Sequence, residues 1–324
     1  MRLAILGAGA VGRSVAELAS EYGHTVTALA DSSSAVVGAD GVAVDAALER
    51  KDAGESLGSG DPDDALTADY DVLVEATPTT LGDAEPGFSH LRAALERDKH
   101  VVLANKGPVA ERYAEVRELE AASDGEVYFE ATVGGAIPVC ATVDDLGAQH
   151  VSAVRGVLNG TANFVLSRMA AEGLDYDHVL AEAQDLGVAE ADPSFDVEGT
   201  DAALKCVIVA NVLREADCDS VAELHDKEVT LADADVEGIR DIPGSALELA
   251  AEDGRTVRLV GEATRDRVSV GPRLVPEHGT LAVTGTRNIV EIDHEYAGGL
   301  AISGRGAGGE ETASAVLADV ARLE

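Results

Sequence analysis

A glycine-rich turn, GAGAVG at residues 7–12, constrains the fold of this chain more than any other segment. The apolar stretch RLAIL precedes it, and apolar residues at helical spacing follow it. Strand, G-x-G-x-x-G turn and helix in this order form the dinucleotide-binding fingerprint, whose glycines allow a tight turn, a close pyrophosphate and close helix packing. The segment predicts a Rossmann-type domain with these candidate cofactor-binding residues: Gly7, Gly9, Ala10, Val11 and Gly12.

Asp31 ends the next predicted strand, HTVTALAD, 19 residues after Gly12. A carboxylate at this position binds the ribose hydroxyls of NAD and repels the 2′-phosphate of NADP. Three serines follow it, at residues 32–34, and soften that preference. Asp31 is therefore another candidate cofactor-binding residue, and the sequence leaves NAD and NADP both open.

Strands and helices alternate up to about residue 131. The segments that predict them are 71–77, 101–105 and 126–132 for strands, and 88–100 and 109–125 for helices. This alternation predicts an α/β fold with a doubly wound parallel sheet. Two helices and then short β-like runs between residues 244 and 295 predict a second, α+β domain, and a glycine-rich loop leads into a last helix.

The net charge of −36, from 60 acidic and 24 basic residues, is spread along the whole chain. Concentrated counterions make such self-repulsion tolerable, so we expect a halophilic protein of a high-salt cytoplasm. We expect no nucleic-acid partner, because that requires a basic surface. No uncharged run reaches the roughly 18 residues of a membrane span, and three cysteines are too few for a disulfide framework or a zinc site.

Two loops carry candidate ligand-binding residues. Asn105 and Lys106, in ANKGPVA, directly follow a predicted strand, and open α/β sheets bind ligands at the carboxyl ends of their strands. The alternative for Lys106 is a solvated loop lysine. The segment FEATVGGAIPV, at 129–139, bends at two glycines and a proline. Its backbone carbonyls suit a hard cation, and a plain connection between two domains is the alternative.

Asp201 and Lys205 lie four residues apart, so they share one face of a predicted helix that continues with apolar residues. Lys205 is one of only five lysines in the chain. The acid-rich stretch before it suits either a solvated surface or a site where carboxylates and a lysine pair near the core. The start of this helix is therefore a candidate for acid–base chemistry.

Six blocks of this sequence, in this order, resemble the homoserine dehydrogenase family: GAGAVG, ANKGPVA, FEATVGGAIPV, LNGTANFVLSRM, ADPSFDVEGTDAALK and GAGGEETASAVLADV. They span nearly the whole chain, and the fourth and fifth together are the most specific. The resemblance implies a dinucleotide-binding domain at 1–133, a substrate-binding and dimerisation domain at 134–297, and a C-terminal segment at 298–324 that packs back on the first domain. No ACT-type regulatory domain is expected, and Phe164 stands where a tyrosine is common.

The resemblance also implies roles for individual residues. Lys205 matches the catalytic lysine, Asp201 its carboxylate neighbour, and Lys106 the lysine where nicotinamide and substrate meet. The other candidate substrate-binding residues are Glu190, Asp196, Gly160 and Thr161. The other candidate cofactor-binding residues are Thr77, Pro78, Asn105 and Gly306. A monovalent cation, Na⁺ or K⁺, is expected at Glu130, Val133, Gly135 and Ile137.

The implied activity is the reversible NAD(P)-dependent interconversion of L-aspartate 4-semialdehyde and L-homoserine by a cytoplasmic homodimer. The substrate oxygen needs a proton as hydride reaches its carbon, and a lysine can supply it. Burial and Lys106 favour the neutral amine of Lys205, whereas Asp201 favours the ammonium. Two alternatives stay open: a semialdehyde dehydrogenase-like enzyme, which would need Cys140 as nucleophile, and a non-catalytic nicotinamide-nucleotide sensor.

Overall fold

The computed structural model describes residues 1–323, and the chain divides into two compact units. The first comprises Met1–Ala136 together with the chain from Ala307 onward, and the second comprises Ile137–Gly306. Within residues 1–323, none of the helices combines the length and the apolar character that crossing a membrane requires.

The first unit is built on a six-stranded sheet with the order β3-β2-β1-β4-β5-β6. Its strands are parallel except for β3, a short antiparallel strand at one edge. The strand order reverses between β1 and β4, so their carboxyl ends border the crevice where such sheets bind ligands. The strands are β1 Arg2–Leu6, β2 Thr25–Ala30, β3 Ala35–Val37, β4 Val72–Glu75, β5 His100–Leu103 and β6 Val127–Tyr128.

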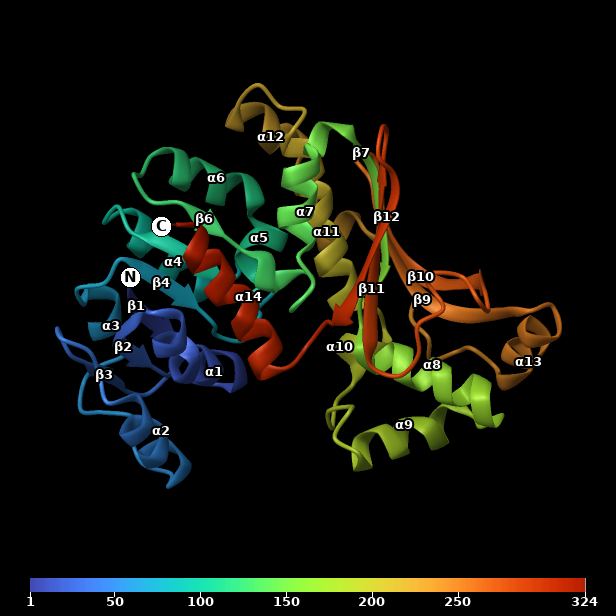
Figure 1. Cartoon of the computed structure of the whole chain (residues 1–324), viewed down its shortest axis with the longest axis horizontal. Helices are drawn as coiled ribbons and strands as arrows, with labels where there is room; N and C mark the ends of the chain where they lie inside the picture. The colour runs from blue at the N-terminus through green and yellow to red at the C-terminus, as the bar shows by residue number, and fades with distance from the viewer. Residues whose placement is uncertain (324) are drawn as a thin grey trace. The chain divides into compact units, whose positions relative to one another are not determined.

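The C-terminal helix α14 belongs to this first unit. Its residues Val316 and Val320 share a core with Val15 of α1 and Ile5 of β1, and α14, red in Figure 1, lies beside α1. The predicted return of the last helix to the dinucleotide-binding fold is therefore observed. The helices of this unit are α1 Ala10–Leu18, η1 Ala19–Tyr22, α2 Val44–Asp52, α3 Asp64–Thr67, α4 Gly87–Leu95, α5 Gly107–Glu111, α6 Tyr113–Ala121, η2 Glu130–Thr132 and α14 Gly309–Arg322.

Two expected elements differ from the structure. The helix predicted at 109–125 is two helices, α5 and α6, which meet at Arg112, where the backbone is non-helical and the guanidinium lies over the Phe88 ring. The strand predicted at 126–132 ends at Tyr128 and gives way to η2. A tertiary contact stabilises that change, because the Glu130 N–H donates to the Asp319 carboxylate of α14 at 2.9 Å.

The second unit is built on a mostly antiparallel sheet with the order β12-β11-β7-β9-β10-β8. β12 pairs with β11, so residues 298–306 lie in this unit, although the sequence suggested that they start the C-terminal segment. The strands are β7 Val151–Val157, β8 Asp235–Val236, β9 Arg255–Ala263, β10 Val268–Pro276, β11 Arg287–His294 and β12 Gly298–Arg305.

Helix α11 packs against β7, β9 and β10 and is buried at every residue from Asp201 to Leu213. The approach is close, because a Cβ on Gly261 of β9 would lie 2.5 Å from Cys206 Sγ. Such packing fixes the first two turns of α11, which carry Asp201 and Lys205. The helices of this unit are α7 Val139–Leu146, η3 Ala148–His150, α8 Gly160–Glu172, α9 Tyr176–Asp185, α10 Ser194–Val197, α11 Thr200–Glu215, α12 Val221–Lys227, η4 Leu231–Asp233 and α13 Gly244–Glu252.

Candidate active site

The glycine-rich turn has the geometry that a pyrophosphate requires. Gly7 has a φ of +99°, and a Cβ there would lie 2.3 Å from the Ala76 carbonyl oxygen. A Cβ on Gly12 would lie 1.7 Å from the Gly7 oxygen, whereas Gly9 faces open space. No side chain caps the N-terminus of α1 at Gly9, so the amides of its first turn, with the helix dipole, suit an anion. The candidate cofactor residues Ala10 and Val11 form that turn.

Asp31 lies directly after β2 and both of its oxygens are engaged. Oδ1 accepts hydrogen bonds from the Ser33 amide and hydroxyl and from those of Ser34, at 2.8–3.2 Å. Oδ2 is ion-paired with the Lys51 ammonium of α2. Burial opposes ionisation, but the hydrogen bonds from Lys51 and Ser33 outweigh it and hold the pKa of Asp31 well below its usual value. Lys51 is a basic group next to the predicted ribose site that sequence reasoning missed.

The loops after β4 and β5 are joined by Asn105, whose side chain is almost fully buried. Asn105 Nδ2 donates to Thr77 Oγ1 at 3.1 Å and to the Pro78 carbonyl at 3.4 Å. The Lys106 amide donates to Thr79 Oγ1 at 3.3 Å. The structure therefore brings four predicted residues together at the carboxyl edge of the sheet, Thr77, Pro78, Asn105 and Lys106.

Lys205 forms a buried ion pair with Asp201 in the second unit, with Nζ 2.7 Å from Oδ2. Nζ also donates to the Leu158 carbonyl at 2.7 Å. The Lys205 side chain is 7% exposed and that of Asp201 is 11% exposed. The four-residue spacing on one helix thus places both side chains in a largely buried site, not on a solvent-exposed face of the helix.

Two asparagines that sequence reasoning missed complete the group around Lys205. Asn159 Nδ2 donates to Asp201 Oδ2 at 2.9 Å and to Asp196 Oδ1 at 2.7 Å. Its Oδ1 caps α8 by accepting from the Ala162 amide at 2.8 Å. Asn288 Nδ2 donates at 2.9 Å to the Leu158 carbonyl that binds Lys205. An asparagine just before a helix is a recognisable N-cap signal, whereas nothing local marks Asn288.

The other predicted substrate-binding residues lie in the segment before α10 and at the start of α8. Glu190 is exposed, and its carbonyl accepts from Gln184 Nε2 at 3.1 Å. Gly160 and Thr161 begin α8, and the Thr161 hydroxyl donates to the Val188 carbonyl at 3.1 Å.

Gly306, predicted to approach the cofactor, is the last residue of the second unit, where a Cβ would lie 1.8 Å from Asn288 Nδ2.

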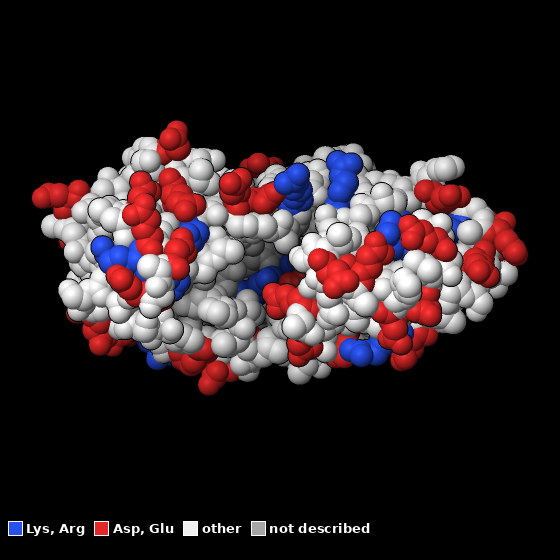
Figure 2. Space-filling model, turned by 90° about the horizontal axis from the view of Figure 1, so that it is seen from below, with Lys and Arg blue, Asp and Glu red and all other residues white. Residues whose placement is uncertain are grey.

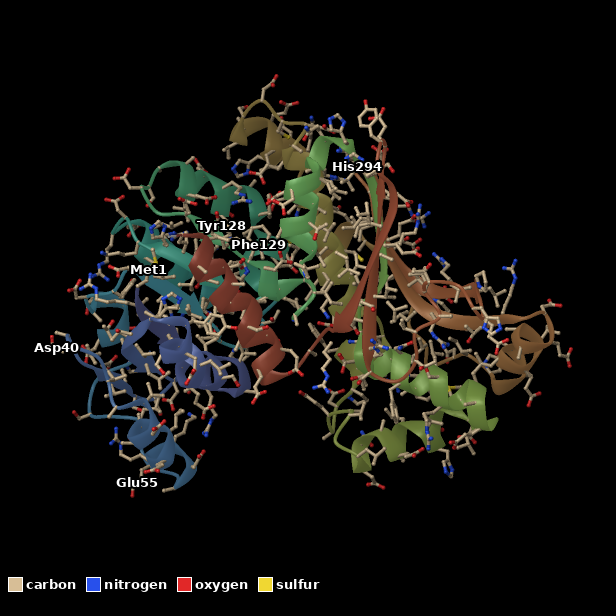
Figure 3. All side chains as sticks on the ribbon, viewed as in Figure 1. Met1, Asp40, Glu55, Tyr128, Phe129 and His294 are labelled. Carbon is tan, nitrogen blue, oxygen red and sulfur yellow. The ribbon has the colours of Figure 1, made fainter. Side chains whose placement is uncertain are left out.

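The predicted cation-binding residues follow one another along the crossover from the first unit to the second. Phe129, labelled in Figure 3, precedes η2, which packs against α14. The Glu130 carbonyl accepts from the Val133 amide at 3.2 Å, Gly135 has a φ of +57°, and Ile137 opens the second unit. Residues 1–323 contain no cluster of three or more His, Cys, Asp or Glu side chains suited to a metal ion, so any ion here would depend on carbonyl oxygens.

Family models match both parts of this chain. Residues 138–321 match a family model described as "Homoserine dehydrogenase", and residues 7–130 match one described as "Homoserine dehydrogenase, NAD binding domain". This chain belongs to the homoserine dehydrogenase family. A homoserine dehydrogenase of Methanocaldococcus jannaschii is 37% identical over 344 residues, covering 100% of this chain and 98% of that protein.

Solved homoserine dehydrogenases have the same fold. The crystal structure of a putative homoserine dehydrogenase from Archaeoglobus fulgidus superposes with a TM-score of 0.88 at 39% identity, covering 100% of this chain and 99% of that one. A hyperthermophilic archaeal homoserine dehydrogenase in complex with NADPH gives a TM-score of 0.80 at 26% identity, covering 99% of this chain and 96% of that one.

The predicted family, the α/β fold class and the assignment as an NAD(P)-dependent oxidoreductase are thereby confirmed. The alternative of a semialdehyde dehydrogenase-like enzyme would need Cys140 as nucleophile, and Cys140 is buried in α7. Burial also raises the pKa of the Cys206 thiol to about 12. Neither thiol has the exposure of a reactive cysteine.

Proposed function

We propose that this chain interconverts L-aspartate 4-semialdehyde and L-homoserine with Lys205 as the acid–base group. The observation that carries this proposal is the set of contacts around Lys205. Asp201 and the Leu158 carbonyl engage two of the three donors of the ammonium. The third donor is then directed to the substrate oxygen.

When bound, NAD(P) would supply or accept the hydride at the carbon that bears this oxygen. In the reducing direction, Lys205 donates a proton to the oxygen as negative charge develops on it, and in the oxidising direction the amine takes that proton back. Asp201 holds the ammonium and keeps it oriented. Asn159 supports that geometry, because it ties Asp201 to Asp196 through one amide.

We propose that Asp196 and Glu190 bind the α-amino group of the substrate. Gly160 and Thr161 are proposed to line the same binding site. The half-buried position of Asp196 in the Lys205 group supports its part in this set. We further propose that Lys106, Thr77, Pro78 and Asn105 bind near the nicotinamide, and that Gly306 supports cofactor binding.

We propose that the enzyme accepts both NAD and NADP. Asp31 supports binding of the ribose hydroxyls, and Lys51, now paired with Asp31, supplies a positive charge for a 2′-phosphate. A monovalent cation bound by backbone carbonyls of Glu130, Val133, Gly135 and Ile137 is also part of this proposal. Its support is the buried, bent backbone of residues 130–135.

The proposed setting is a cytoplasm with high salt, where the enzyme acts as a homodimer. Figure 2 supports the salt dependence, since acidic side chains are scattered over the face that it draws and outnumber basic ones there. The net charge of −36 makes screening by counterions favourable for folding. The dimer is supported by β12, an edge strand whose residues are exposed or half-buried.

Initial rates of L-homoserine oxidation in high potassium chloride, with NAD and NADP in parallel, test the proposal. We expect turnover with at least one cofactor, and we expect Lys205→Ala to abolish it while the cofactor still binds. Lys227→Ala is a matched control, because Lys227 pairs with an acidic residue four positions earlier, Glu223, on an exposed helix. A folded Lys205→Ala variant that keeps most of its activity would refute the catalytic assignment.

A further inference from the structure

Glu75, the last residue of β4, carries a fully buried carboxylate that has no role in the chemistry above. Oε2 lies 2.6 Å from His90 Nδ1 of α4. Oε1 accepts from the Thr77 amide at 2.9 Å and also from the Thr77 hydroxyl. Burying a carboxylate is costly unless donors surround it, so these three donors account for its stability at this position.

The carboxylate determines the direction of the hydrogen bonds that follow it. A carboxylate only accepts, so the Thr77 hydroxyl gives its proton to Glu75 and its oxygen serves as an acceptor. Asn105 Nδ2 donates to that oxygen at 3.1 Å, and Asn105 Oδ1 accepts from the Gly107 amide at 2.9 Å. Glu75 therefore sets, through Thr77, which way the Asn105 amide faces.

The residues held in this way lie beside the nucleotide-binding turn. A Cβ on Gly7 would lie 2.8 Å from the Thr77 amide nitrogen, so the Thr77 turn is in close contact with the glycine-rich turn. Lys106 lies between Asn105 and Gly107, the two residues joined by the Asn105 side chain. A shift of Thr77 would therefore move the backbone of the loops after β4 and β5, next to the crevice that the carboxyl ends of β1 and β4 border.

We propose that Glu75, together with His90, is a positioning residue pair for hydride transfer. It holds Thr77, Pro78 and Asn105 in the arrangement that orients the nicotinamide half of NAD(P), without touching the cofactor itself. The inference rests on the proposed function, which places these three residues near the nicotinamide.

Binding of two probes separates this role from general stability. NAD⁺ carries the nicotinamide, whereas ADP-ribose lacks it but keeps the diphosphate that suits the glycine-rich turn. We expect Glu75→Leu to weaken NAD⁺ binding at least about fivefold and to lower kcat by about 100-fold, since small misplacements at a reacting centre have effects of that size. The Kd of ADP-ribose should stay within about twofold of wild type, because the turn at residues 7–12 is unchanged.

Two further variants keep the test decisive if Glu75→Leu does not fold. Glu75→Gln should retain most activity, because Gln Oε1 accepts from Thr77 while Nε2 donates to a His90 tautomer that has a free Nδ1 lone pair. His90→Leu should reduce kcat more than it changes ADP-ribose binding. The matched control is Asp71→Leu, at the opposite end of β4, where the carboxylate accepts from the Arg2 amide at 2.8 Å. We expect this control to leave kcat and both Kd values unchanged.

Equal losses of NAD⁺ and ADP-ribose affinity in Glu75→Leu and His90→Leu would overturn the proposal, because they would indicate a loosened domain. Unchanged kcat and NAD⁺ affinity in both variants would overturn it too. Absence of homoserine oxidation by the wild-type protein would instead refute the proposed function. The two binding measurements would still decide whether Glu75 positions the nicotinamide half.

Discussion

The buried pair Asp201–Lys205 allows a sharp prediction about stability. Asp201→Asn keeps the shape of the side chain and an acceptor oxygen but removes the charge opposite a buried ammonium. Removing one partner of a buried ion pair costs about 3–5 kcal/mol. For a unit of this size, each kcal/mol shifts the Tm by about 2–4 °C, so the second unit should melt at least about 6 °C lower.

The exposed pair Glu223–Lys227 is the matched control. It has the same acid-to-lysine order and the same four-residue spacing on a helix, but its side chains are 40% and 41% exposed, whereas those of Asp201 and Lys205 are 11% and 7% exposed. Glu223→Gln should therefore shift the Tm by about 2 °C or less. The comparison isolates burial, because sequence spacing and charge are the same in both pairs.

A double-mutant cycle completes the test. Adding Lys205→Met to Asp201→Asn removes the stranded ammonium and should recover most of the lost stability, with a coupling energy of about 2–4 kcal/mol. Thermal unfolding followed by circular dichroism in high salt would measure all four proteins. Equal Tm shifts for Asp201→Asn and Glu223→Gln, or no recovery in the double variant, would refute the reasoning.

Four further outcomes are expected. Lys51→Met should lower kcat/KM with NADP more than with NAD, since it removes the cation paired with Asp31; equal losses would contradict that role. Replacing K⁺ or Na⁺ by tetramethylammonium at constant ionic strength should lower the homoserine oxidation rate, because carbonyl ligands suit only a small cation; an unchanged rate would remove the cation from the proposal. Dilution into low-salt buffer should reduce activity and ellipticity together, given the net charge of −36, and full retention of both would argue against halophily. The Arg2 guanidinium holds the pKa of Asp71 below its usual value, so this contact stabilises the fold above the unfolded pKa of about 4 and that stability is lost as pH falls through the lower folded pKa; the stability gap between wild type and Asp71→Asn should narrow as the pH falls below about 4, and a gap independent of pH would refute it.

The parts of the site that depend on local spacing could be predicted from the sequence. The glycine turn, Asp31 at the end of its strand and the i, i+4 pair of Asp201 with Lys205 each follow from a short-range pattern. Asn288 could not be found this way, because β11 brings it to the Leu158 carbonyl from 130 residues away. Glu75 was also missed, since a carboxylate at the end of an apolar strand gives no sign that a histidine 15 residues later will reach it.

Local patterns also failed where tertiary contacts outweigh propensity. The run at 109–125 has helical spacing throughout, yet Arg112 leaves the helix and binds Glu115 while its guanidinium lies over Phe88. The strand expected at 126–132 is shortened where Asp319 accepts from the Glu130 amide. Phe88 and Asp319 lie on other elements, and Glu115 lies beyond the break between two helices. Neither change is therefore visible in the spacing of apolar residues.

The place of α14 in the first unit has a consequence for how the chain acquires its structure during synthesis. Val316, Leu317 and Val320 belong to the same core as β1 and α1, but they leave the ribosome only after all of Ile137–Gly306. Domains of nascent chains ordinarily fold in order from the N-terminus. Here the second unit is continuous in sequence and can fold first, whereas the core of the nucleotide-binding unit stays incomplete until α14 has been synthesised. Nascent chains halted before residue 309 should therefore expose apolar surface in that half and recruit chaperones there.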